Sequence, residues 1–147
     1  MVIEISKTSI RANIYKNFYD LINAISDLNG RVYPKYSDKV RNSKNDYPAV
    51  IIYPANTPSN RLTAKKNNIN GTILIEVFAT NDKDADHYSD LIDNKIDENK
   101  HLLSRNNLRL IELEDESDSD DMRGQIRGFI KRLTYSFQFY YVAGGGY

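Results

Sequence analysis

The sequence predicts an α+β domain in which an antiparallel or mixed β-sheet carries two helices packed on one face. Two segments space their apolar residues by three and four positions, as amphipathic helices do. Others are short, apolar or alternating in polarity, and bounded by Pro, Gly or Asn, as strands are. The expected order is α-β-β-β-α-β-β, ending in a long strand. Because 147 residues suit a single core, we expect one domain over residues 1–142 and a flexible Gly-rich tail over 143–147.

The first helix is expected over residues 8–29. Thr8 or Ser9 is a suitable N-terminal cap, and Gly30 lies where a left-handed residue commonly ends a helix. One stripe of apolar side chains is predicted to face the core: Ile10, Ile14, Phe18, Leu21, Ile22, Ile25 and Leu28.

Three strands are expected next, over residues 31–33, 49–53 and 72–79. The first stops at Pro34, and the second is a β-branched run between Pro48 and Pro54. The polar segments that join these strands are predicted to be loops, over residues 34–46 and 54–71.

A second helix is expected over residues 80–104, followed by strands over 108–113 and 125–142. Thr80 or Asn81 can cap this helix, and the aspartates of its first turns suit the helix dipole. The last strand alternates large apolar with polar residues, so we expect it to be half buried and to bend, bulge or project. The acidic segment 112–121, with seven acids and no base, is predicted to be a solvated loop.

The charge balance argues against a dedicated nucleic-acid-binding protein. Lys and Arg together number 20, as do Asp and Glu, so the cationic excess that phosphate binding requires is missing. Cysteine is absent, which excludes disulfides and cysteine-bound zinc. The sequence starts with no secretory-signal pattern and has no apolar run long enough to span a membrane, so we expect folding in a cytoplasm.

Catalytic motifs are not found in the sequence: it has no nucleophile elbow, phosphate-binding loop, dinucleotide fingerprint or zinc-protease motif. His87 and His101 are separated by almost four helical turns, roughly 20 Å, so they cannot bind one ion together. The acidic segment does not fit the EF-hand register, since Met122 takes the fifth position counted from Asp118. An irregular divalent-ion site, as in a small metal-dependent enzyme, stays open as the least favoured alternative. We predict no enzyme activity, no metal and no cofactor.

Two charged segments are candidate contact surfaces. Segment 54–71 carries Arg61, Lys65 and Lys66 and no acid. A basic segment and an acidic segment on one neutral protein favour head-to-tail self-association, although a merely solubilising loop and a lining for passing DNA are open alternatives. The acidic partners in this hypothesis are Glu114, Asp115, Glu116, Asp118, Asp120 and Asp121.

The arrangement as a whole resembles the tail-terminator, or tail-completion, proteins of long-tailed bacteriophages. In that family an amphipathic helix precedes a "VYP" piece, here Val32-Tyr33-Pro34, and a "YPAV-I" strand, here residues 47–52. A strand ending in "VFA" follows, here Val77-Phe78-Ala79, and an acidic linker leads to an "R–L-Y-F-F" strand, here residues 132–139. The acidic segment is longer than the pattern has it, and the Gly-rich tail is extra.

This resemblance implies a structural virion protein without catalytic residues or cofactor. Its copies would form a hexameric ring that caps the tail tube, stops its polymerisation and docks the head connector. The implied partners are further copies of the chain, the tail-tube protein and the head connector or stopper protein. DNA would pass through the ring without sequence recognition, and no membrane is involved. The implied location is the tail–neck region of the virion, after assembly in the host cytoplasm. A head–tail joining or stopper protein of the neck is the alternative.

Overall fold

A computed structural model of the chain describes residues 4–5, 10–28, 30–34, 48–57, 66–121 and 128–143. The elements are β1 (Glu4–Ile5), α1 (Ile10–Asn23), the 3-10 turn η2 (Ser26–Leu28), β2 (Val32–Pro34), β3 (Ala49–Ile52), β4 (Lys66–Ala79), α2 (Asp82–Glu98), α3 (Lys100–Arg105), β5 (Leu108–Asp121) and β6 (Gly128–Ala143). The predicted class, a mixed sheet with helices, is confirmed in this coarse form.

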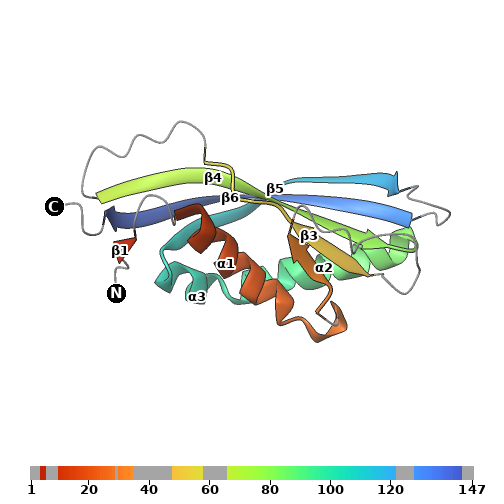
Figure 1. Cartoon of the computed structure of the whole chain (residues 1–147). Helices are drawn as coiled ribbons and strands as arrows, with labels where there is room; N and C mark the ends of the chain where they lie inside the picture. Colours follow the sequence, from red (N-terminus) through yellow and green to blue (C-terminus); the bar gives the residue numbers. More distant parts are fainter. Residues whose placement is uncertain are drawn as a thin grey trace.

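The six strands form one sheet, and the two long strands β4 and β6 pair in its interior (Figure 1). Strand order is β1-β6-β4-β3-β2, and β5 also pairs with β6. The β4–β6 register is antiparallel and unbroken from Lys66↔Val142 to Ala79↔Phe129. The short strands β1 and β2 pair in parallel with β6 and β3, which makes the sheet mixed.

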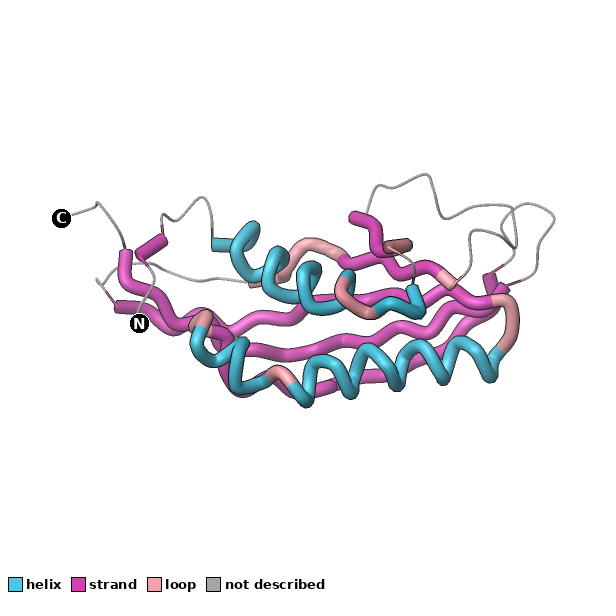
Figure 2. Tube along the Cα trace, turned by 90° about the horizontal axis from the view of Figure 1, so that it is seen from below, coloured by secondary structure: helices cyan, strands magenta, loops and turns pink. Residues whose placement is uncertain are grey.

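The helices lie together on one side of the sheet, and in the view from below they run in front of the strands (Figure 2). The main core lies between these two layers. The apolar stripe of α1 includes Phe18, whose ring centroid is 6.3 Å from that of Phe137 on β6. Alternate residues of β4 and β6, such as Ile75 and Leu133, face the same core. The period-two pattern therefore positions one face of each long strand against the helices.

A second, smaller apolar cluster lies at one end of the sheet, formed by the other parity of the same strands. It contains Ala49, Ile51, Phe78 and Ile130, with Tyr33 and Tyr53 packed against it. In the described part of the chain, no helix is long and apolar enough to cross a membrane.

The two expected helices differ from those observed. α1 ends at Asn23 rather than near residue 29, and η2 follows it. Gly30 is left-handed as expected, with φ of 72°, but it ends the η2 turn, where Arg31 N donates to Leu28 O. The second helix is broken into α2 and α3 at Asn99, whose side chain donates to Lys95 O over 2.8 Å and so competes with the helical backbone bonds. Asn81 caps α2, accepting from Asp84 N over 2.8 Å.

The strands differ more. The prediction that residues 66–71 belong to a loop is wrong, because β4 begins at Lys66 and pairs there with β6. The acidic segment is not a loop either: it is the second half of β5. The expected tail begins too early, since Ala143 belongs to β6 and pairs with Ile5. The predicted order also lacked β1. The predicted loop over residues 34–46 begins one residue too early, because Pro34 ends β2. The rest of that segment and the helix caps predicted at Thr8 and Ser9 lie outside the described residues.

Candidate contact surface along the β5 edge

The predicted contact residues fall into a described and an undescribed group. Arg61 and Lys65 lie outside the described residues, and Lys66 opens β4, where its backbone pairs with Val142. All seven acids of residues 112–121 belong to β5. The described acidic side chains Glu112, Glu114, Asp115, Glu116 and Asp118 are exposed, whereas only the backbone is described for Asp120 and Asp121.

β5 is an edge strand. One side of it pairs with β6 from Leu108↔Phe139 to Asp121↔Gly128, and among the described strands none pairs with its other side. Two register shifts interrupt the ladder, between Arg109 and Glu112 and between Leu113 and Asp115. Bulges and charges on an edge both discourage uncontrolled strand addition, and bulges also re-aim side chains at binding surfaces.

The backbone at the first bulge is strained. Leu110 has a left-handed φ of 51°, which is unfavourable for a branched side chain, and 70% of its surface is exposed. Its side chain gains no core packing in return. Such an outlier points to a role for Leu110 outside the core, which its exposure at the edge of the sheet permits.

A groove of about 560 Å³ lies beside this bulge, between α3 and β5. Its walls are Lys100, His101 and Ser104 of α3 and residues 108–112 of β5. Arg109 on the groove wall is held over the ring of Tyr140, with Cζ 5.0 Å from the ring centroid. Arg105, also exposed, lies in the last turn of α3. The cationic side chains of Lys100 and Arg109 and the exposed side chain of Leu110 therefore line the same groove.

The acidic half of β5 is organised around one lysine. Lys131 of β6 places Nζ 2.8 Å from Glu116 Oε1 and 3.7 Å from Asp118 Oδ1. The same Nζ is 2.5 Å from Asp86 Oδ1 on α2. Hydrogen bonds to Asp86 and Glu116 raise the pKa of Lys131. This cluster explains how a strand so rich in acids stays paired, and it joins β5, β6 and α2.

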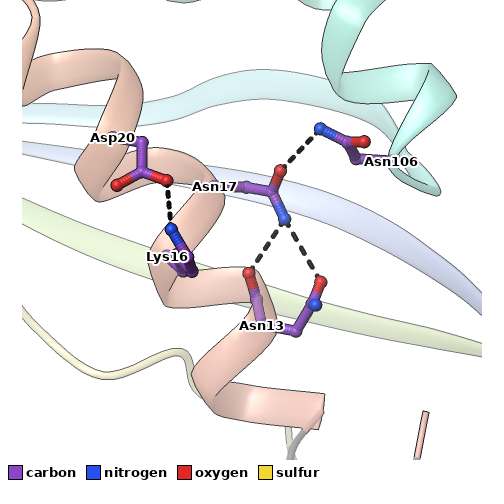
Figure 3. Close-up of polar contacts among 5 residues, drawn as sticks. All are labelled: Asn13, Lys16, Asn17, Asp20 and Asn106. Atoms are coloured by element: carbon purple, nitrogen blue, oxygen red, sulfur yellow. Dashed lines mark hydrogen bonds and ion pairs between the residues drawn. The ribbon is translucent and has the colours of Figure 1, made fainter. Parts of the chain in front are cut away.

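The junction between α1 and the end of α3 is fixed by asparagines (Figure 3). Asn106 Nδ2 donates to Asn17 Oδ1 over 2.9 Å, and Asn17 Nδ2 donates to Asn13 O over 2.9 Å. On the same helix Lys16 and Asp20 form an exposed ion pair of 2.6 Å. A second groove, of about 350 Å³, runs here between α1 and α2–α3 and includes the half-exposed Leu102. These contacts position α3, and therefore its groove with β5.

A buried carboxylate lies on the sheet face that carries the smaller apolar cluster. Glu76, 5% exposed, accepts from the Tyr53 hydroxyl through Oε1 and from Arg132 Nε over 2.8 Å through Oε2. Both carboxylate oxygens therefore have a donor, as a buried charge requires. The arrangement is that of a structural ion pair linking β4 to β6.

The histidines and carboxylates that could bind a metal or act in catalysis do not form a common site. His87 and His101 are both exposed, His87 against the ring edge of Tyr88 and His101 in the groove. Within the residues that the structure covers, no three metal-ligating side chains group together. Glu116 and Asp118, part of the suspected divalent site, instead share Lys131.

The sequence reasoning missed the groove. Apart from Glu112, its residues lie in the stretch 99–111, which has three basic residues, one histidine and no acid and is visible in the sequence. Sequence patterns placed Lys100 near the end of one long helix and Arg109 in the strand that follows it, and they did not indicate that the two side chains lie together. The break at Asn99 and the bulge at Leu110 bring them together.

No protein-family model matches the sequence, and no curated protein matches it. Among solved structures, a similar protein named only by a sequence identifier is 16% identical, over 92% of this chain and 97% of that chain, with a TM-score of 0.42. At that TM-score the likeness indicates neither the fold nor the function of this chain.

Proposed function

We propose that the protein is a tail terminator of a long-tailed bacteriophage. Its copies form a hexameric ring that caps the tail tube, stops polymerisation and offers a docking face to the head connector. The observation that carries this proposal is the long edge strand β5, which is unpaired on one side within the described chain and rich in exposed charge. The exposed charges of such an edge supply electrostatic register for a neighbour, while its bulges and charges limit uncontrolled strand addition.

The family-like segments support the proposal from the sequence side. Val32-Tyr33-Pro34 forms β2, Val77-Phe78-Ala79 ends β4, and residues 132–139 are the middle of β6. Each lies in the sheet that connects the exposed edge to the core. A capping ring needs such a rigid body, because a loosely packed subunit would not hold its contact edges in register.

The contact residues follow from the charges. We assign the acids Glu114, Asp115, Glu116, Asp118, Asp120 and Asp121 to contacts with a neighbouring copy or the tube. Arg61, Lys65 and Lys66 are a basic contact proposed from the sequence, toward an acidic surface of a neighbouring copy or of the tube. Reversing those three to Glu is expected to leave the monomer folded and to block assembly. Unimpaired assembly of that variant would remove these three residues from the interface.

The experiment that tests the function uses polymerising tail-tube protein. Adding the purified protein is expected to shorten the tubes and to place a ring at one tube end, seen by negative-stain electron microscopy. The variant Lys83→Glu, which changes an exposed lysine of α2, is the matched control and is expected to cap equally well. Unchanged tube lengths with bare ends would contradict the terminator proposal. Binding to the head connector without an effect on tubes would favour the joining or stopper protein of the neck instead.

A further inference from the structure

The free edge of β5 changes the sign of its charge at the first bulge. Residues 99–111, which include α3 and the start of β5, carry three basic residues, one histidine and no acid, whereas 112–121 carries seven acids and no base. Asp82, Asp84 and Asp86 at the start of α2 add to the acidic end, since Lys131 links Asp86 to Glu116 and Asp118. One edge of the molecule therefore has a cationic end and an anionic end.

Beyond Glu112, which lies on the groove wall itself, the acids of β5 are separated from the groove cations along the strand. Arg109 pairs with Gln138 of β6 and Asp115 with Thr134, four positions apart on β6, which corresponds to roughly 13 Å at about 3.3 Å per residue. That separation exceeds the screening distance of about 8 Å at physiological ionic strength. Lys100 does reach Asp97 over 3.2 Å, but both side chains are about half exposed or more. The cations of the groove thus keep most of their capacity to meet an outside partner.

We propose that the groove between α3 and β5 receives the acidic end of β5 of a second copy, head to tail. Lys100 and Arg109 of one copy face Glu114 and Asp115 of the next, and the exposed Leu110 tip supplies the apolar contact between them. This inference rests on the proposed function, for which it names the interface between subunits. A second copy is the occupant because the groove is complementary to a surface that every copy carries.

Nucleic acid fits the groove less well. The acids that follow the groove on the same edge would repel a phosphate backbone running along β5. A head-to-tail contact also leaves one groove and one acidic end unsatisfied at the ends of every open assembly. The contact therefore repeats from copy to copy, and it gives a closed ring where the rotation between neighbouring copies closes and an open filament where it does not.

Two charge-reversal variants test the interface. The groove variant is Lys100→Glu with Arg109→Glu, and the acidic-end variant is Glu114→Lys with Asp115→Lys. Their matched controls reverse exposed residues elsewhere on the helices: Lys16→Glu with Lys83→Glu, and Asp27→Lys with Asp90→Lys. Far-UV circular dichroism and urea unfolding first establish that each variant is folded.

Sedimentation velocity across concentration gives the readout. Wild type and both controls are expected to form species larger than a dimer at low salt and to dissociate at high salt. Each reversal variant alone is expected to stay monomeric. An equimolar mixture of the two is expected to assemble again, because every groove then meets an acidic end of opposite sign.

Four results would overturn the proposal. The first two are reversal variants that assemble like wild type and a mixture that stays monomeric. The other two are a wild type that stops at two copies and a wild type that is monomeric at its highest soluble concentration. The terminator proposal is judged separately by tube capping. If tube capping survives both reversals, the terminator proposal is retained and this interface is rejected. If wild type self-assembles through this interface but does not cap tubes, the interface is retained and the terminator proposal is rejected. Assembly only on added DNA would point to the nucleic-acid alternative.

Discussion

Tyr135, in the middle of β6, donates a hydrogen bond from its hydroxyl to Oδ1 of Asp93 on α2, over 2.8 Å. The ring is 1% exposed, so this contact joins the helical layer to the sheet from within the core. Burial, reinforced by the hydrogen bond to the Asp93 carboxylate, raises the pKa of Tyr135. Ionisation of this tyrosine is therefore coupled to unfolding.

Stability is expected to fall as the pH rises above about 10, the pKa of an unfolded tyrosine. The folded-state pKa is raised, so the contribution of Tyr135 is fully present below that pH and is lost above it. Tyr135→Phe should reduce the free energy of unfolding by about 1 kcal/mol at pH 8, through loss of the hydrogen bond. It should also make the alkaline loss shallower. Urea unfolding from pH 8 to 11 measures both effects, with Tyr88→Phe as control. An equally steep alkaline loss in Tyr135→Phe would contradict the coupling.

Removing Lys131 is expected to destabilise the protein at low salt. Lys131→Met leaves Glu116, Asp118 and Asp86 without their shared cation. The three carboxylates are 42–70% exposed, so solvent screening limits the loss to about 1 kcal/mol. Urea unfolding at low and high salt checks this prediction, since screening should shrink the difference between variant and wild type. Lys83→Met is the control, and a deficit independent of salt would show that packing rather than charge is involved.

Gly71 is expected to tolerate no side chain. A Cβ there would lie 2.4 Å from Asn56 O and 2.9 Å from Phe137 Cζ, at the point where Asn56 and Thr72 exchange backbone hydrogen bonds. Gly71→Ala should lower the free energy of unfolding by about 2 kcal/mol, the usual range for overpacking. The comparison is Gly30→Asn, which keeps a residue tolerant of φ 72° in open space and should be close to neutral. Thermal melting of Gly71→Ala and Gly30→Asn measures this difference in stability. Equal melting temperatures would contradict the close approach of Asn56 O to the Gly71 position.

Leu110→Asn is expected to separate stability from assembly. Asn adopts a left-handed φ more readily than Leu, so the variant should gain about 0.5–1 kcal/mol of stability. The same change removes the apolar tip beside the groove and should weaken self-association several-fold. Leu113→Asn, at a position on β5 without a left-handed φ, should give no such gain. Chemical unfolding measures the stability of each variant, and sedimentation velocity measures its self-association. A lower free energy of unfolding in Leu110→Asn than in wild type would contradict backbone strain at the bulge.

Patterns local in the sequence predicted the packed parts of the fold. The stripe from Ile14 to Ile22 faces the core, and the alternation along β6 separates Leu133 and Tyr135, which face the helices, from Arg132 on the other face. Both predictions succeed because burial depends on residues a few positions apart. The acidic segment 112–121 is also visible in the sequence, and its role as a contact surface stays a prediction.

The strand conformation of the acidic segment, however, depends on partners far along the chain. Asp and Asn disfavour strands, yet residues 66–70 and 115–121 are strands because β6 supplies the backbone partners for both. Lys131 also compensates part of the acidic charge. The groove needed two breaks in regularity, at Asn99 and Leu110, that no periodicity signals.

The central position of β6 has a consequence for how the chain is made. β6 follows β1, β4 and β5 in the chain, yet it pairs with all three. Until it emerges from the ribosome, the sheet is limited to β2, β3 and β4, and the strand β4 presents a long open edge. Such late, long-range pairing is slow and exposes the nascent chain to aggregation. Synthesis near a chaperone, or a pause before residue 128 is translated, would therefore matter more for the yield of folded protein than the stability of the finished subunit.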